Sequence, residues 1–186
     1  MPPFSKAPWR RKLVRRTALI MEKVSRERII NVAGYREGVA GKLSNFTPAR
    51  FELDGVHWPS FENYWQALKF SQDDHRRQQL ETCDPITAKR IGSQVKKHFL
   101  WFHDGEKEII IPFGSPHIYE IAKRAERARF EENPDQLEAL LATRNAYLMH
   151  WVDWPDSKSL PRKVFCRILM ELRDEFRKKS NFSVSK

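Results

Sequence analysis

Residues 43–70 read LSNFTPARFELDGVHWPSFENYWQALKF, and this stretch carries clear local signals for a hairpin and a helix. Apolar and polar residues alternate on both sides of Asp54-Gly55. This dipeptide suits a type I′ turn, because both central positions of that turn need a positive φ angle. The stretch therefore predicts a small β-hairpin near residues 51–58.

A helix is expected after the hairpin, and it carries a short row of polar side chains. Ser60 can cap its first turn, and we expect the helix to run through Phe70. Positions four and seven apart share one face of a helix, so Glu62, Gln66 and Lys69 form one polar row. Two interpretations stay open. The row faces water, as on an ordinary surface helix, or it faces a cleft where the carboxylate takes part in acid–base catalysis.

Aromatic residues occupy a neighbouring face of the same helix. Phe61 and Leu68 are expected to lie in the core. Trp65 has two open roles, as a core residue or as a flat surface on which a base stacks. Tyr64 and Trp58 are further candidates for the stacking role.

Four prolines mark the starts of helices in the rest of the chain. A Pro after Asp, Ser or Asn suits the first helical turn, where its missing N–H is not needed. The predicted helices are Pro85 to about Phe99, Pro116 through Phe130, one opened by Pro134 and one opened by Pro161. The last has the clearest 3.6-residue apolar period. The fold class is therefore mainly α, a compact multihelical domain with one small β-hairpin.

Three glycines, Gly34, Gly38 and Gly41, predict a loop ahead of this domain. We accordingly expect a basic N-terminal arm and loop over residues 1–41. The domain itself is expected over residues 42–179, and a polar tail over residues 180–186.

Positive charge is concentrated at the N-terminus. Residues 1–28 contain nine Lys or Arg and two Glu, which is +7 of the total formal charge of +10. Such an arm can attract nucleic acid or a phosphorylated ligand through its long-range field. A solvated basic helix without a specific partner is an equal alternative, and the arm also has some features of a mitochondrial transit peptide.

The two cysteines, Cys83 and Cys166, provide neither a disulfide framework nor a metal-binding spacing. A reduced, cytoplasmic setting is the default expectation for such a chain. Cys166 falls on the apolar face of the last predicted helix, so we expect it in the core. The longest apolar runs are far too short to cross a membrane, and the six histidines show no paired metal spacing.

Several short blocks resemble a known family. Ser44-Asn45-Phe46 is followed by FELDG at 51–55 with Trp58, and then by ENYWQA at 62–67 with Lys69-Phe70. In this order the blocks resemble the SNF…ELDG…W…EHYFQAQKF pattern of the NADAR superfamily. Further similar blocks are AKRIG at 88–92, FEENP at 130–134, LLAT at 140–143 and LMELR at 169–173. The likeness spans roughly residues 42–173.

The resemblance implies a mainly α, YbiA-like fold and an enzyme that cleaves N-glycosidic bonds. The implied substrates are ribosylamino intermediates of riboflavin synthesis or ADP-ribose attached to guanine bases, with no sign of a metal or organic cofactor. Glu62 matches the glutamate of the family motif, and Asp153 is the second candidate catalytic residue. The candidate substrate-binding residues are Asn45, Phe46, Trp58, Tyr64, Trp65, Gln66, Lys69, Lys89, Arg90 and Trp151. We expect a small phosphorylated ribosyl or ADP-ribosyl partner and no membrane, and nucleic acid is a candidate partner through the basic arm.

The resemblance weakens between residues 151 and 166. The family carries a Trp-Gly-Asp-Gly stretch there. In this chain Trp151 and Asp153 stand at the Trp and Asp positions, whereas Val152 and Trp154 replace the two glycines. Neither residue has the conformational freedom of Gly or lets backbone approach a ligand as closely. Two alternatives follow: the substrate differs from the family's, or the chain binds a ligand without cleaving it.

Overall fold

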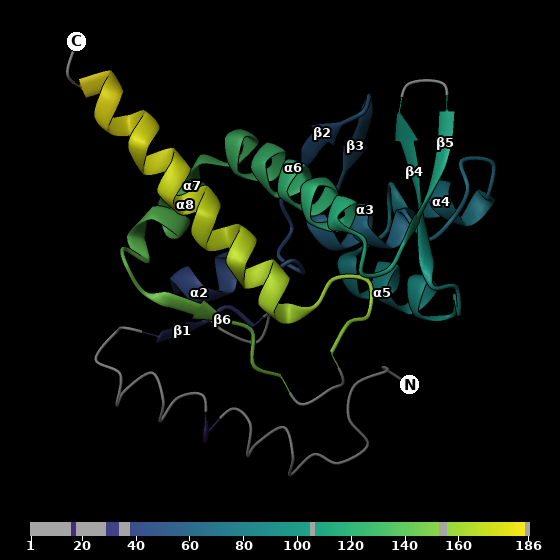
Figure 1. Ribbon diagram of the computed structural model, residues 1–186, viewed down its shortest axis with the longest axis horizontal. Coiled ribbons are helices and arrows are strands. Elements are labelled where there is room, and N and C mark those ends of the chain that lie inside the picture. The colour runs from purple at the N-terminus through teal and green to yellow at the C-terminus, as the bar shows by residue number, and fades with distance from the viewer. Residues whose placement is uncertain (1–15, 18–28, 34–37, 105–106, 153–155, 185–186) are drawn as a thin grey trace. The chain divides into compact units, whose positions relative to one another are not determined.

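The computed structural model describes residues 16–17, 29–33, 38–104, 107–152 and 156–184 (Figure 1). Within these residues the fold is mainly α, as the sequence predicted. It has seven helices and three two-stranded sheets, whereas the sequence predicted one hairpin. The described chain forms two compact units. One comprises residues 45–133 and 157–161, and the other takes in the rest. The predicted domain boundaries at 42 and 180 stay predictions.

The unit of residues 45–133 and 157–161 begins with the predicted hairpin. Strands β2 (Phe51–Leu53) and β3 (Val56–Trp58) pair in antiparallel fashion. Asp54 and Gly55 have φ angles of 57° and 73°, so the turn adopts the expected positive values. Helix α3 (Phe61–Ala67) follows, and the Oγ atom of Ser60 accepts a hydrogen bond from the backbone N of Asn63.

Helix α3 ends at Ala67, three residues before the predicted end. The backbone N atoms of Lys69 and Phe70 bond to carbonyls three residues back, so the chain tightens into a turn there. Phe61 and Leu68 are fully buried, as predicted.

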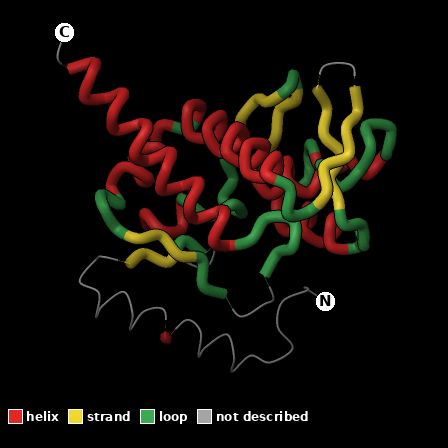
Figure 2. Tube along the Cα trace, in the orientation of Figure 1, coloured by secondary structure: helices red, strands yellow, loops and turns green. Residues whose placement is uncertain are grey.

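The chain between 71 and 115 contains more β structure than predicted. Helix α4 (His75–Leu80) was not anticipated, and α5 (Pro85–Ser93) stops well before Phe99. Strands β4 (Phe99–Asp104) and β5 (Lys107–Pro112) then form an antiparallel hairpin, the rightmost yellow pair in Figure 2. The predicted helix end at Phe99 was wrong, because the chain leaves the helix after Ser93 and Phe99 begins a strand. The aromatic and β-branched residues of β4 and β5 favour a pleated surface.

Helix α6 (Pro116–Glu132) completes this unit and confirms the predicted helix through Phe130. Ser115 caps it, with its Oγ atom accepting from the backbone N of His117. The helix packs against α3 and β2, as Figure 1 shows. The core between them contains the buried side chains of Phe51, Trp58, Phe61 and Phe130.

The other unit joins chain segments that are distant in sequence. Strand β1 (Ile29–Asn31) pairs in parallel with β6 (Tyr147–Met149), a pairing that the sequence did not predict. Helix α2 (Gly38–Lys42) replaces the loop expected around Gly38 and Gly41. The predicted helices at Pro134 and after Pro161 are confirmed as α7 (Pro134–Ala142) and α8 (Arg162–Val184).

Helix α8 packs against α7 and β6 through its apolar face. Ile168, Leu169 and Leu172 are completely buried, and Cys166 is 3% exposed, so its core location is confirmed. Burial raises the pKa of the Cys166 thiol to about 12, which keeps it protonated. The basic arm lies outside the described residues apart from Arg16 and Thr17. In the described part of the chain, no helix is long and apolar enough to span a bilayer.

Candidate functional site

The candidate site is built on α3, and its position is set by hydrogen bonds on both sides of the helix's first turn. The backbone N of Glu62 donates to the carbonyl O of Asn45 at 3.0 Å. On the opposite side, the Nδ2 atom of Asn63 donates to the carbonyls of Leu80 and Cys83, each at 2.8 Å. These bonds fix the rotation of α3, so that Glu62 and Gln66 point away from solvent.

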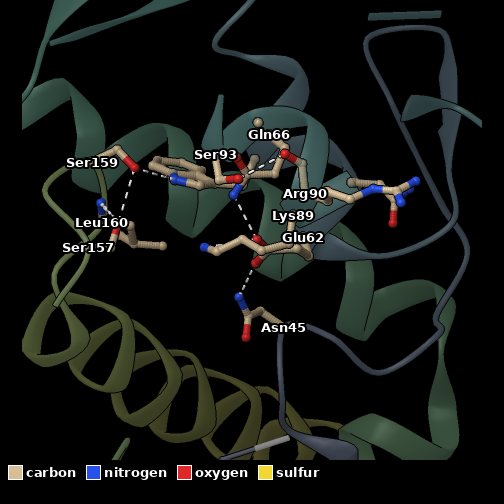
Figure 3. A network of polar contacts seen from close by, with 12 residues as sticks. Asn45, Glu62, Gln66, Lys89, Arg90, Ser93, Ser157, Ser159 and Leu160 are labelled. Carbon is tan, nitrogen blue, oxygen red and sulfur yellow. Dashed lines mark hydrogen bonds and ion pairs between the residues drawn. The ribbon is translucent and has the colours of Figure 1, made fainter. Parts of the chain in front are cut away.

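Three donors surround the carboxylate of Glu62 (Figure 3). Its Oε1 atom accepts from Nε2 of Gln66 at 2.7 Å and lies 3.2 Å from Nζ of Lys89. Its Oε2 atom accepts a hydrogen bond from Nδ2 of Asn45. Glu62 is only 1% exposed, and Lys89, on α5, provides the positive charge that a buried carboxylate requires.

The polar row is therefore buried, and the alternative in which it faces water is excluded for Glu62 and Gln66. Lys69 follows the end of α3, and its Nζ atom donates to the carbonyl O of Gly92 at 3.0 Å. Burial and the nearby charge of Lys89 lower the pKa of Lys69 to about 8, and Glu62 opposes this shift. Lys69 is thus electrostatically coupled to the carboxylate.

Gly92 allows α5 to approach α3 closely. A Cβ atom at this position would lie 1.8 Å from Oε1 of Gln66, a distance at which no side chain fits. The φ angle of Gly92 is not in the left-handed region. Glycine is therefore required here by the close packing of the two helices and not by the backbone conformation. The close approach brings Lys89 to Glu62.

Two amide oxygens at the site are shielded from water and unpaired within the described chain. They are Oδ1 of Asn45 and Oε1 of Gln66. Buried acceptors of this kind usually have a donor in proteins, so each oxygen lacks the hydrogen bond that it would ordinarily make. The site therefore combines a buried carboxylate, an ammonium group and two amide oxygens that have no donor within the described chain.

The aromatic candidates lie in packed surroundings. Trp65 is 3% exposed and stacks on Phe61 with ring centroids 5.8 Å apart and an interplanar angle of 9°. Its Nε1 atom donates to Oγ of Ser159 at 3.0 Å. Trp58 and Tyr64 meet edge to face, with centroids 5.6 Å apart, and both line a separate cavity of about 470 Å³. All three rings serve the core, and a base-stacking role for any of them stays a prediction.

The remaining candidates occupy other parts of the chain. Phe46 is half-buried, and Arg90 is exposed on α5, one residue past Lys89. Trp151 belongs to the other unit, where its backbone N and O bond to the side chain of Asn31. Asp153 and Trp154 lie outside the described residues, so the role of Asp153 stays a prediction.

Sequence reasoning missed two contributors to the arrangement. Ser159 enters the unit from a short segment, residues 157–161, and no local pattern indicated that its hydroxyl would meet Trp65. The packing role of Gly92 was also missed, although an isolated Gly inside a predicted helix is a signal of close approach. No group of three or more His, Cys, Asp or Glu side chains in the described chain is placed to hold a metal ion.

No family model matches the chain. It is, however, similar to curated proteins named N-glycosidase YbiA. For the proteins from Escherichia coli strain K12 and Shigella flexneri, the identity is 28% over 162 residues, covering 83% of this chain and 92% of the relative.

A protein of Vibrio vulnificus, named riboflavin biosynthesis protein VVA0006, is also similar. It is 29% identical over 153 residues, covering 77% of this chain and 38% of that longer protein. Among solved structures, the NMR structure of Escherichia coli YbiA matches with a TM-score of 0.58 and 25% identity. That match covers 83% of this chain and 88% of the solved one.

Proposed function

Because this chain belongs to the YbiA-like NADAR family, we propose that it is a hydrolase that cleaves an N-glycosidic bond. The bond joins a ribosyl or ADP-ribosyl group to a base or amino-pyrimidine. One observation carries the proposal: the carboxylate of Glu62 is buried among Asn45, Gln66 and Lys89.

The chemistry of the reaction suits a carboxylate held in this way. Breaking a C1′–N bond develops positive, oxocarbenium-like charge on the ribose, while negative charge develops on the departing base. A carboxylate beside C1′ stabilises that cation or activates the attacking water, as in the carboxylate-based hydrolysis of O-glycosides. Glu62 takes this role in our proposal.

The neighbours of Glu62 supply the remaining functions. Lys89 is a cationic donor that can protonate the departing base or balance its charge. The amide oxygen of Asn45, which has no donor within the described chain, accepts a ribose hydroxyl group. Because these groups are held by the fold before substrate arrives, they need little reorganisation during the reaction.

The substitution Glu62→Gln tests the proposal. Glutamine has nearly the same shape, so the fold is expected to persist, while turnover falls on the order of 10²- to 10⁴-fold. The assay incubates the protein with a panel of N-ribosylated compounds and ADP-ribosylated DNA, and it detects the released sugar or base by mass spectrometry. Glu138→Gln, which changes an exposed carboxylate on α7, is the matched control and should keep full activity. Equal turnover in the Glu62→Gln variant and the unmodified protein rejects the catalytic role.

A second candidate function is a binding module for ADP-ribose, NAD-like ligands or modified nucleic acid. The replacement of two family glycines by Val152 and Trp154 favours it, because a changed loop can preserve binding and abolish cleavage. Calorimetry with ADP-ribose, combined with product analysis, distinguishes the two functions. Tight binding with no released product supports the module.

The proposal also covers the cellular location and the binding partners of the protein. We expect a reduced, cytoplasmic location, the default for a chain whose cysteines, Cys83 and Cys166, form no disulfide pattern. The substrate partner is a small phosphorylated ribosyl or ADP-ribosyl compound, and the basic arm is a candidate site for nucleic acid binding.

A further inference from the structure

A second, strongly basic cavity lies at the C-terminal end of the α3 segment. We call it the basic cavity; its volume is about 400 Å³, within the range of small-ligand sites. Its lining residues are Lys69, Phe70, Arg76, Val95, Lys96 and Lys97. Four of these six side chains are cationic, and none is acidic.

Only one of the four cations is neutralised by a carboxylate within the described chain. Arg76 forms two hydrogen bonds with Asp74, at 2.9 and 2.6 Å, and its guanidinium lies 4.6 Å from the ring centroid of Phe70. Lys96 and Lys97 are exposed and have no carboxylate partner among the described residues. The cavity therefore keeps an excess of positive charge that an anion can neutralise.

Aromatic rings hold Lys97 in place. Its Nζ atom lies 5.4 Å from the ring centroid of Phe99 and 5.2 Å from that of Trp101. These cation–π interactions restrict the lysine side chain without neutralising it. A cation that is positioned in advance loses less conformational entropy when it binds an anion.

Lys69 connects the basic cavity to the site around Glu62. It lines the cavity, and its Nζ atom bonds to the carbonyl O of Gly92, which packs against Gln66. Gln66 in turn donates to the carboxylate of Glu62. The lowered pKa of Lys69 responds to both Lys89 and Glu62, so the two sites are electrostatic neighbours.

We propose that the basic cavity binds a phosphate group of the substrate, with Lys96 and Lys97 as its principal ligands and Lys69 between the phosphate and Glu62. The claim that this phosphate belongs to the substrate rests on the proposed glycosidase function. The phosphate can belong to a free phosphorylated nucleotide or to a nucleic acid backbone, and both present the same anionic oxygens.

Inorganic pyrophosphate tests the cavity without requiring any reaction. Calorimetry is carried out on the full chain, on the double variant Lys96→Gln/Lys97→Gln, and on the control Lys178→Gln/Lys179→Gln. The control removes two adjacent exposed lysines from α8, and Lys179 also lies over an aromatic ring, that of Phe176. The net charge changes equally in both variants.

We expect the unmodified chain and the control to bind pyrophosphate alike, and the Lys96/Lys97 variant to bind at least about tenfold more weakly, as expected when charge-assisted hydrogen bonds are removed. Equal affinity in all three proteins, or no binding to the unmodified chain, overturns the proposal. Circular dichroism of the variant, whose two substitutions are at exposed positions, checks that its fold is retained.

Two further measurements distinguish failure of the proposed phosphate site from failure of the proposed glycosidase function. KM for a cleaved phosphorylated substrate should rise in the Lys96/Lys97 variant, with kcat little changed and with no effect on an unphosphorylated analogue. If pyrophosphate binds at the lysines but no glycoside is cleaved, the glycosidase function fails and the phosphate site stands. Competition by ribose 5-phosphate, compared with an oligonucleotide lacking terminal phosphates, identifies which source of phosphate the cavity accepts.

Discussion

Gln66 packs against Gly92 at the candidate site, in the space where any other residue would place its Cβ atom. The side chain of Gln66 lies between the carboxylate of Glu62 and the backbone of α5, and Gly92 leaves the space that it occupies. Lys69 bonds to the carbonyl of the same glycine. Because Gly92 has no side chain, α5 lies close enough to α3 to position Gln66 and Lys69, two members of the polar row.

Gly92→Ala should disturb this packing. The added methyl group would lie 1.8 Å from Oε1 of Gln66, so either the amide or the helix must move. Overpacking of this kind costs about 1–3 kcal/mol in the free energy of unfolding. Urea denaturation measures that change, and turnover should fall as well because Gln66 would no longer orient Glu62. The neighbouring substitution Ser93→Ala, at an exposed position, is the control, and a Gly92→Ala protein as stable and active as the control would contradict the prediction.

Among the elements, α6 contains a buried ion pair that the proposed reaction does not use. Nη2 of Arg129 lies 2.7 Å from Oε2 of Glu126, and both side chains are 0% exposed. The carboxylate oxygens accept no well-aligned hydrogen bond from the described residues. A pair of this kind contributes little net stability, because the cost of removing two charges from water offsets their attraction.

A double-mutant cycle on α6 tests this interpretation. Glu126→Leu or Arg129→Met alone should cost about 3–5 kcal/mol, because each removes the opposite charge of the buried ion pair. The double variant should be about as stable as the unmodified protein, or more stable. Urea denaturation at pH 7 gives the three differences, and strictly additive effects would contradict the expectation.

The same pair should make stability depend on pH. Burial outweighs the attraction of Arg129 and raises the pKa of Glu126 from its ordinary value of 4.5 to about 7. The folded protein therefore binds more protons than the unfolded chain between these values, so its stability falls as the pH rises from about 4.5 to 7. The double variant should lack this contribution, and urea denaturation of both proteins across this pH range checks it.

At the scale of the whole molecule, the unequal distribution of charge is the main feature. Residues 1–28 carry +7 of the total charge of +10, and the other 158 residues share the remaining +3. If the protein binds nucleic acid, most of the attraction should come from these residues, because the salt dependence of binding follows the number of phosphates neutralised.

Deleting residues 1–28 tests this expectation. DNA and RNA affinity should fall, and the slope of log K against log salt concentration should decrease by about 0.7–0.9 for each phosphate that is no longer neutralised. Fluorescence anisotropy over a range of salt concentrations measures both quantities, and a thermal melt verifies that the shortened protein is folded. An unchanged slope would place the nucleic acid site elsewhere or exclude it.

Local signals in the sequence were sufficient to predict much of the fold. The Asp54-Gly55 turn and the caps at Ser60, Asp84 and Ser115 depend on hydrogen bonds within a few residues, so short patterns predict them well. The long apolar face of α8 is equally local, since it repeats with the period of the helix itself.

Interactions between distant segments were not predictable in the same way. Ile29 pairs with Tyr147, and Asn45 and Lys89 reach Glu62 from 17 and 27 residues away along the chain. Sequence spacing placed Glu62, Gln66 and Lys69 in one row, but the row fits a solvated face as well as a buried one. Burial depends on which segments cover a face, and that is a property of the packed chain rather than of the helix. The pattern of residues thus predicted the longer helices, the Asp54-Gly55 turn and the family likeness, whereas the packing of distant segments buried Glu62 and Gln66.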